Sequence, residues 1–205
     1  WQSTPSSDVF RVLSGGTPKT DIPAYWDGDI PFFTPKDADN NFYALKTEQN
    51  ITDKGLESCN SRLYPKDTIF ITARGTVGKL ALANRPMAMN QSCYALVPWN
   101  EGGVYFYFMA IRNAITYVKG VSKSGVFDNI IVDTFKTVPI LTPTKELVER
   151  FNDSVAPCFQ QVSALLEANE LLVSMRDKLL PRLISGKLPV EHLDIHFPPG
   201  MQEAG

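Results

Sequence analysis

The sequence predicts an α+β protein in which a mixed-sheet domain over residues 1–143 is followed by a long helical arm over residues 144–188. The best strand pattern is residues 68–73, a β-branched and aromatic run that turns through two glycines and returns as residues 80–83. In the arm, apolar residues recur in steps of three and four, which is typical of a helix packed against another helix. Residues 189–205 are expected to form a C-terminal tail.

The composition, 43% apolar over 205 residues, is that of a folded domain with an appendage. The sequence has no run of 18 apolar residues, so we expect no membrane span. Cys59, Cys93 and Cys158 are odd in number and far apart, which argues against a disulfide framework or a metal site and fits a reducing cytoplasm. Because the chain begins with Trp1 and not with Met, we expect that an upstream segment is missing.

Charge is nearly balanced in the first part of the chain. Residues 1–143 hold 14 Lys and Arg against 13 Asp and Glu, a net charge of +1, whereas residues 144–205 hold 6 against 9, a net charge of −3. A head with this balance does not bind polyanions through a general basic surface. If it binds nucleic acid, we expect a local patch to do so.

Polar turns rich in glycine and proline supply the candidates for such a patch. They occupy residues 14–20, 34–37, 74–79, 90–91 and 120–127, and each follows or precedes an apolar run. If the chain binds DNA, the side chains that would contact it are Thr17, Lys19, Thr34, Lys36, Asp37, Arg74, Thr76, Lys79, Asn90, Gln91, Lys123 and Ser124.

The turn at residues 74–79 resembles a phosphate loop only superficially. A Walker motif has four residues between its glycines and Ser or Thr after its lysine. Here two residues separate Gly75 from Gly78, and Leu80 follows Lys79. A hairpin that presents Arg74 and Lys79 to an anion is the better interpretation, since glycine lets the backbone approach closely.

Asn90 and Gln91 stand just before a predicted strand. Both side-chain types can pair bidentately with adenine in the major groove. A structural role as a turn cap is an equally good interpretation from the sequence alone.

The sequence offers little material for catalysis. Its two histidines, His192 and His196, both lie in the C-terminal tail, and no nucleophile–base pair or cofactor loop is recognisable. The segment at residues 84–87, Asn-Arg-Pro-Met, does not fit the Asp/Asn-Pro-Pro-Tyr/Phe motif of methyltransferases. We therefore expect a non-catalytic chain without a cofactor or a metal.

The arm is expected to contain a short helix over residues 144–154 and a long helix from about residue 155, because Pro157 suits a first helical turn. Pro181 and Gly186 are expected to end it. Two polar residues on its apolar seam would fix register and partner choice. The seam comprises Phe159, Val162, Leu166, Asn169, Val173, Arg176, Leu180 and Leu183.

Three segments together resemble the DNA specificity subunit of type I restriction–modification systems. They are the Gly-Gly-Thr-Pro-Lys and Tyr-Trp-Asp-Gly-Asp-Ile-Pro opening, the Arg-Gly-Thr-Val-Gly-Lys and Asn-Gln middle, and the Lys-Leu-Leu-Pro-Arg-Leu-Ile-Ser-Gly-Lys-Leu end of the arm. The resemblance covers residues 15–188. It implies a target recognition domain followed by a conserved helix, and in that family two such helices pack as an antiparallel coiled-coil spacer.

The resemblance also implies the partners: double-stranded DNA with a bipartite target, methyltransferase subunits, and a nuclease–translocase subunit that joins the complex. This chain holds one head and one arm, so we expect either half of a longer polypeptide or a half-length subunit that forms a homodimer. A rod of about 39 Å would suit half-sites one DNA turn, about 34 Å, apart. The alternative is a coiled-coil protein-interaction adaptor that binds no DNA.

Overall fold

The structure is a computed structural model that describes residues 1–39, 41–121 and 129–188. The chain divides into two compact units, Trp1–Ala164 and Leu165–Gly205. The first unit extends past the expected domain limit at residue 143 and includes residues 145–164 of the last helix. In the part of the chain that the structure describes, no helix is both long and apolar enough to span a membrane.

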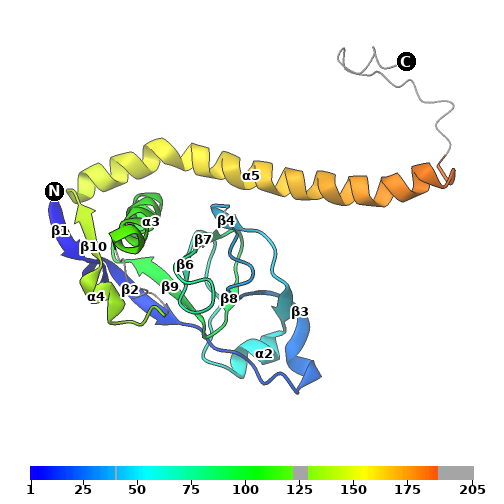
Figure 1. The fold of residues 1–205 in the computed structure, drawn as a ribbon, viewed down its shortest axis with the longest axis horizontal. Helices are drawn as coiled ribbons and strands as arrows, with labels where there is room; N and C mark the ends of the chain where they lie inside the picture. Colours follow the sequence, from blue (N-terminus) through cyan, green and yellow to red (C-terminus); the bar gives the residue numbers. More distant parts are fainter. Residues whose placement is uncertain (40, 122–128, 189–205) are drawn as a thin grey trace, which may run out of the picture. The chain divides into compact units, whose positions relative to one another are not determined.

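The described residues of the first unit form three sheets. Figure 1 shows most of their strands, with α3 beside them. Neighbouring strands are parallel in two pairs and antiparallel elsewhere, which confirms the predicted mixed-sheet α+β fold. The five-stranded sheet has the order β2 (Phe10–Ser14), β9 (Cys93–Pro98), β6 (Ile69–Thr72), β7 (Leu80–Ala83) and β4 (Tyr43–Ala44). The three-stranded sheet has the order β5 (Gln49–Ile51), β3 (Trp26–Phe33) and β8 (Ala88–Met89), and β1 (Gln2–Pro5) pairs with β10 (Pro139–Thr142).

The helices among the described residues are α1 (Ser6–Val9), α2 (Asp53–Glu57), α3 (Val104–Val121), α4 (Thr134–Thr137) and α5 (Lys145–Ile184), with 3₁₀ turns at Pro23–Tyr25 and Glu101–Gly103. The predicted hairpin is confirmed as β6 and β7. The apolar run at residues 104–118 predicts a mostly buried helix, which is confirmed as α3. The sequence also predicts a strand at residues 137–141, and the observed strand β10 begins later because Thr137 ends α4.

Strand β6 lies in the middle of the five-stranded sheet and is buried on both faces. Phe70 faces Phe33, with 5.0 Å between the ring centroids. Tyr64 packs edge-on against Phe70, with 5.7 Å between the centroids. Ile69 and Ile71 point to the opposite face, because side chains alternate along a strand, and both are fully buried. A strand covered on two faces needs an unbroken apolar sequence, which is what made it recognisable.

The first part of α5 belongs to the core of the first unit. Phe159 is 6% exposed and stacks on Tyr105 of α3, with a centroid distance of 4.3 Å, and it also packs against Phe42 at 5.5 Å. Ser163, also buried, donates a hydrogen bond from Oγ to Oδ1 of Asn84. Phe159, expected on a seam for a second helix, therefore packs within its own unit.

Two expectations about the arm were wrong. The arm is one helix from Lys145 to Ile184, and Pro157 lies inside it. Proline costs an internal helix a hydrogen bond and crowds the preceding turn, but the buried Val148 and Phe159 hold the helix on the head on both sides of Pro157. Pro181 also lies inside the helix. The helix ends at Ile184, two residues before Gly186, whose φ of +68° fits the expected stop there.

Candidate nucleic-acid interface

The strand register brings three of the predicted polar turns to one end of the five-stranded sheet. Strand β6 ends at Thr72 opposite Cys93, the first residue of β9, and β2 ends at Ser14 opposite Tyr94. The turn after β6, the turn before β9 and the loop after β2 therefore leave the sheet side by side. We call this end of the sheet the loop edge.

The loop after β2 lies against the turn before β9. Thr17 donates a hydrogen bond from Oγ1 to Oε1 of Gln91, and the Gly16 amide donates to the Met89 carbonyl at 3.2 Å. A Cβ on Gly15 would collide with the carbonyl oxygens of Met89 and Asn90. Glycine is thus required for this approach of the two backbones.

The turn at residues 34–37 lies against the turn at residues 74–79. Thr76 donates from Oγ1 to the Pro35 carbonyl at 3.1 Å, and Lys79 donates from Nζ to the Ala38 carbonyl at 2.8 Å. The loop edge therefore brings together four of the turns that the sequence singled out.

Thr34 and Asp37 build their turn. The backbone amide and the hydroxyl of Thr34 each donate to Asp37 Oδ2 at 2.7 Å, and the Glu48 amide donates to Asp37 Oδ1 at 2.7 Å. Asn90 caps its own turn, because its Oδ1 accepts from the Ser92 amide at 3.0 Å. In this arrangement these three side chains serve as turn formers.

Other candidates point outward at the loop edge. Lys19, Arg74 and Gln91 are exposed, and the side chains of Lys19 and Arg74 make no hydrogen bond or ion pair with any described residue. Lys36 pairs with Glu48 at 3.0 Å, but both are well exposed, and such pairs contribute little stability. The free cations are therefore available to an anion from solution.

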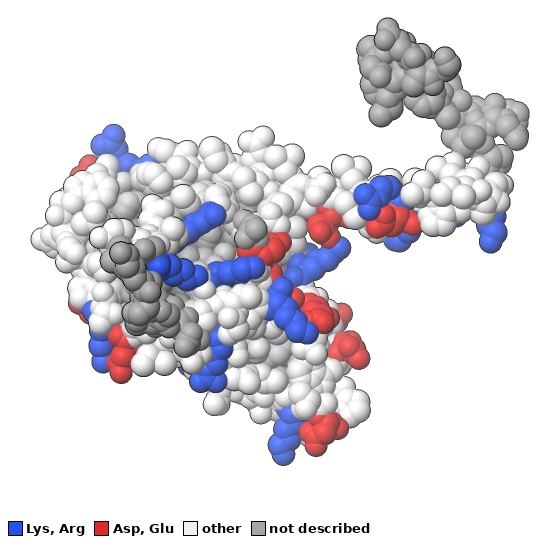
Figure 2. Space-filling model, viewed as in Figure 1, with Lys and Arg blue, Asp and Glu red and all other residues white. Residues whose placement is uncertain are grey.

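Lys119, in the last turn of α3, also reaches the loop edge and was missed by the sequence analysis. Its Nζ donates to the Val77 carbonyl, and burial, followed by the positive charge of Lys79, lowers the pKa of the Lys119 ammonium. Arg112 lies seven residues earlier, on the same helical face. This spacing was the signal that could have found both. Figure 2 shows Lys and Arg side chains gathered across one face of the first unit.

The remaining two candidates, Lys123 and Ser124, lie outside the described residues. Within the described residues, no group of three His, Cys, Asp or Glu side chains is arranged to hold a metal ion.

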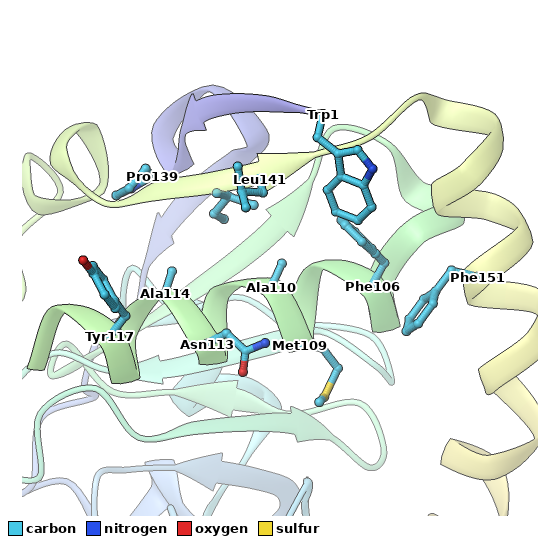
Figure 3. Close-up of a pocket in the computed structure, with 11 residues that line it drawn as sticks. Trp1, Phe106, Met109, Ala110, Asn113, Ala114, Tyr117, Pro139, Leu141 and Phe151 are labelled. Carbon is cyan, nitrogen blue, oxygen red and sulfur yellow. The ribbon is translucent and has the colours of Figure 1, made fainter. Parts of the chain in front are cut away.

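A second surface of the first unit is apolar. In Figure 3 Trp1 lies over Phe106, and Phe151 of α5 lies beside it. The ring centroid of Phe106 lies 6.5 Å from that of Trp1 and 5.7 Å from that of Phe151. The groove has a volume of about 580 Å³ and no charged lining residue, so it offers mainly apolar contact area. Its lining is Trp1, Phe106, Met109, Ala110, Asn113, Ala114, Tyr117, Pro139, Ile140, Leu141 and Phe151.

Comparison with known proteins identifies the family of the chain. Residues 1–162 match the family described as type I restriction modification DNA specificity domain. The chain belongs to this family. The chain is 35% identical over 151 residues to the type I restriction enzyme MjaIX specificity subunit of Methanocaldococcus jannaschii, covering 71% of this chain and 35% of that protein. It is 26% identical over 191 residues to the type I restriction enzyme HindI specificity subunit of Haemophilus influenzae, covering 92% of this chain and 42% of that protein.

Solved structures share the specificity-domain fold. The S subunit of a type I system from M. genitalium superposes with a TM-score of 0.66 at 18% identity, over 89% of this chain and 45% of that one. HsdS of Thermoanaerobacter tengcongensis superposes with a TM-score of 0.57 at 19% identity, over 92% of this chain and 46% of that one. The chain thus spans less than half the length of these relatives.

Proposed function

We propose that this chain binds double-stranded DNA in a sequence-specific manner as the specificity subunit, or half of one, of a type I restriction–modification complex. Partner methyltransferase and nuclease subunits would then methylate adenine and cleave where it binds. Membership of the family supports the class of function. The observation that carries the assignment is the convergence of four polar turns at the loop edge, beside Lys19 and Arg74, whose side chains pair with no described residue.

We assign the cations and the amide to different tasks. Lys19, Arg74 and Lys79 would contact phosphates, which position a protein without reading sequence. Gln91 is the best base reader, since its exposed amide can donate and accept at once. Thr17 holds the Gln91 oxygen, which would fix the direction in which the amide nitrogen points.

We further propose that residues 1–143 form the target recognition domain and that the arm over residues 144–188, which contains helix α5, is the spacer. The spacer would pack antiparallel on the helix of a second copy of this chain. Two observations support this: the relatives are more than twice as long as the matched region, and the described part of the second unit exposes many large apolar side chains. These are Leu165, Leu171, Leu172, Val173, Met175, Leu179, Leu180, Leu183 and Ile184.

Two heads joined in this way would read a bipartite target. The helix beyond the first unit, residues 165–184, is about 30 Å long at 1.5 Å per residue, close to one turn of DNA, about 34 Å. The length of the spacer would therefore set the gap between the two half-sites.

DNA binding is tested with Arg74→Gln. The matched control is Lys66→Gln, because Lys66 is exposed at the other end of β6. Arg74→Gln is expected to lower the slope of log K against log salt by about 0.9, the value of one phosphate contact, and Lys66→Gln is expected to leave it unchanged. Fluorescence anisotropy with a labelled duplex measures both.

If Arg74→Gln left the slope of log K against log salt unchanged, Arg74 would not contact DNA. If the parent chain showed no salt-dependent DNA binding, the proposal itself would fail. The protein-interaction adaptor, which the apolar groove and the exposed helix would serve, would then be the better account.

A further inference from the structure

Helix α3 and the turn at residues 74–79 enclose a small polar cleft that two cations line, and a third cation lies beside it against Gly78. Lys79 comes from the turn, and Arg112 and Lys119 come from one face of the helix. The cleft has a volume of about 140 Å³, and Lys79, Arg112 and Thr116 line it. A space of this size suits a phosphate group better than a whole nucleotide.

The cleft has more hydrogen-bond donors than acceptors. Lys79 donates one N–H to the Ala38 carbonyl at 2.8 Å, and Lys119 donates one to the Val77 carbonyl. An ammonium has three donors, so each keeps two. The guanidinium of Arg112 lies 4.7 Å from the centre of the Phe42 ring and makes no hydrogen bond with any described residue.

The positive charge of the cleft is poorly compensated. None of the three cations forms an ion pair with a described residue. The carboxylate of Asp39 also lines the cleft, but its oxygens accept from the Asn41 amide at 2.7 Å and from Asn41 Nδ2 at 2.6 Å. The two lining cations together with Lys119 beside them, against one carboxylate, leave a net charge of +2, which an incoming anion would relieve.

Gly78 lets the turn and the helix approach each other. A Cβ there would lie 2.8 Å from Cε of Lys119 and 3.0 Å from Cγ2 of Ile115, and its φ of +72° favours glycine. The backbone thus holds Lys119 close to Lys79 despite their repulsion. A close group of like charges held by the backbone is what a preformed anion site requires.

We propose that Lys79, Arg112 and Lys119 bind a backbone phosphate of the DNA, so that α3 is a second point of attachment beside the loop edge. This inference rests on the proposed function. Contacts to phosphate carry no sequence information. The site therefore adds affinity for every sequence equally and leaves base reading to the turns.

The test uses the full chain and labelled 30-base-pair duplexes of several random sequences. The variant is Arg112→Gln/Lys119→Gln, and the control is Lys54→Gln/Lys66→Gln, which removes two exposed cations elsewhere on the first unit. The variant is expected to lose about 0.9 from the salt slope, which corresponds to about eightfold weaker binding at 0.1 M salt. The same factor is expected for every duplex, and the control should lose much less.

A second variant is expected to change the affinity for DNA in the opposite direction. Asp39→Asn removes the carboxylate of the cleft and keeps an oxygen that can accept from the Asn41 amide. It is expected to bind every duplex several-fold more tightly, an effect that damage to the fold does not produce. Weaker or unchanged binding by Asp39→Asn would overturn the inference.

The two proposals fail in different ways. If the parent binds DNA with a salt slope that Arg74→Gln lowers, but Arg112→Gln/Lys119→Gln behaves like its control, the phosphate site is wrong and the proposed function stands. If the parent shows no salt-dependent binding, both are wrong.

Discussion

The two parts of α5 share one helical pattern and lie in different surroundings. In residues 145–164, Val148, Phe159 and Ser163 are buried against the head. In residues 165–184, six leucines are 39–63% exposed: Leu165, Leu171, Leu172, Leu179, Leu180 and Leu183. The period of three and four is continuous through both.

The comparison teaches what helical periodicity can and cannot predict. It identifies a face that is apolar enough to be covered. It does not tell whether the covering surface belongs to the same chain, because the aromatic rings of α3 and a leucine from a second copy of the chain satisfy the same spacing. Phe159 and Leu180 occupy equivalent positions by periodicity and have different neighbours. The predictions below test that difference.

The largest effect is expected from Phe159→Ala. The ring packs against Tyr105, Phe42 and Phe108, and its removal should lower the free energy of unfolding by about 3–5 kcal/mol. Leu180→Ala, at a half-exposed position, should leave the unfolding of the head unchanged at protein concentrations too low for dimerisation. Urea denaturation of both variants at such a concentration measures the contrast, and equal losses would contradict it.

The second prediction concerns association. Val173→Glu/Leu180→Glu places two carboxylates on the proposed seam, where burial of unpaired charge is costly. Dimerisation should weaken by a factor of about 100, or about 2.7 kcal/mol, as measured by sedimentation equilibrium.

The control for association is Lys178→Glu, an exposed position off that seam, which should leave dimerisation nearly unchanged. A parent chain that stays monomeric at micromolar concentration would rule out the second copy as the partner of the helix.

The smallest effect is expected from two serines on α5. Ser163→Ala removes a buried hydrogen bond to Asn84 and should lower the free energy of unfolding by about 1–2 kcal/mol. Ser154→Ala removes an exposed bond to the Arg150 carbonyl and should cost only a few tenths of a kcal/mol. Thermal denaturation compares the two, and a larger loss in Ser154→Ala would contradict the anchoring role of Ser163.

Much of the head could be predicted from the sequence because its signals are local. The unbroken apolar run of β6 and the glycines of the following turn defined a hairpin. The turns at residues 14–20, 34–37 and 90–91 were recognisable as polar and exposed. That they meet was not predictable, since it depends on strand register between segments far apart in the chain.

The errors have the same origin. Pro157 is tolerated inside α5 because contacts from the head hold the helix on both sides, and propensity does not register such contacts. Thr34 and Asp37 are a different case, because they hydrogen-bond each other within their own turn and their contact with DNA stays a prediction. Lys119 was missed because α3 was judged by its apolar face, and its position beside Lys79 follows from the tertiary fold.

The central claim is that this chain directs a complex to particular DNA sequences. It is tested most directly by mapping methylated adenines genome-wide in cells that carry the intact system, with and without the gene for this chain. The account predicts a bipartite methylated motif that disappears when the gene is deleted and returns when it is restored. An unchanged set of methylated adenines after deletion would contradict it.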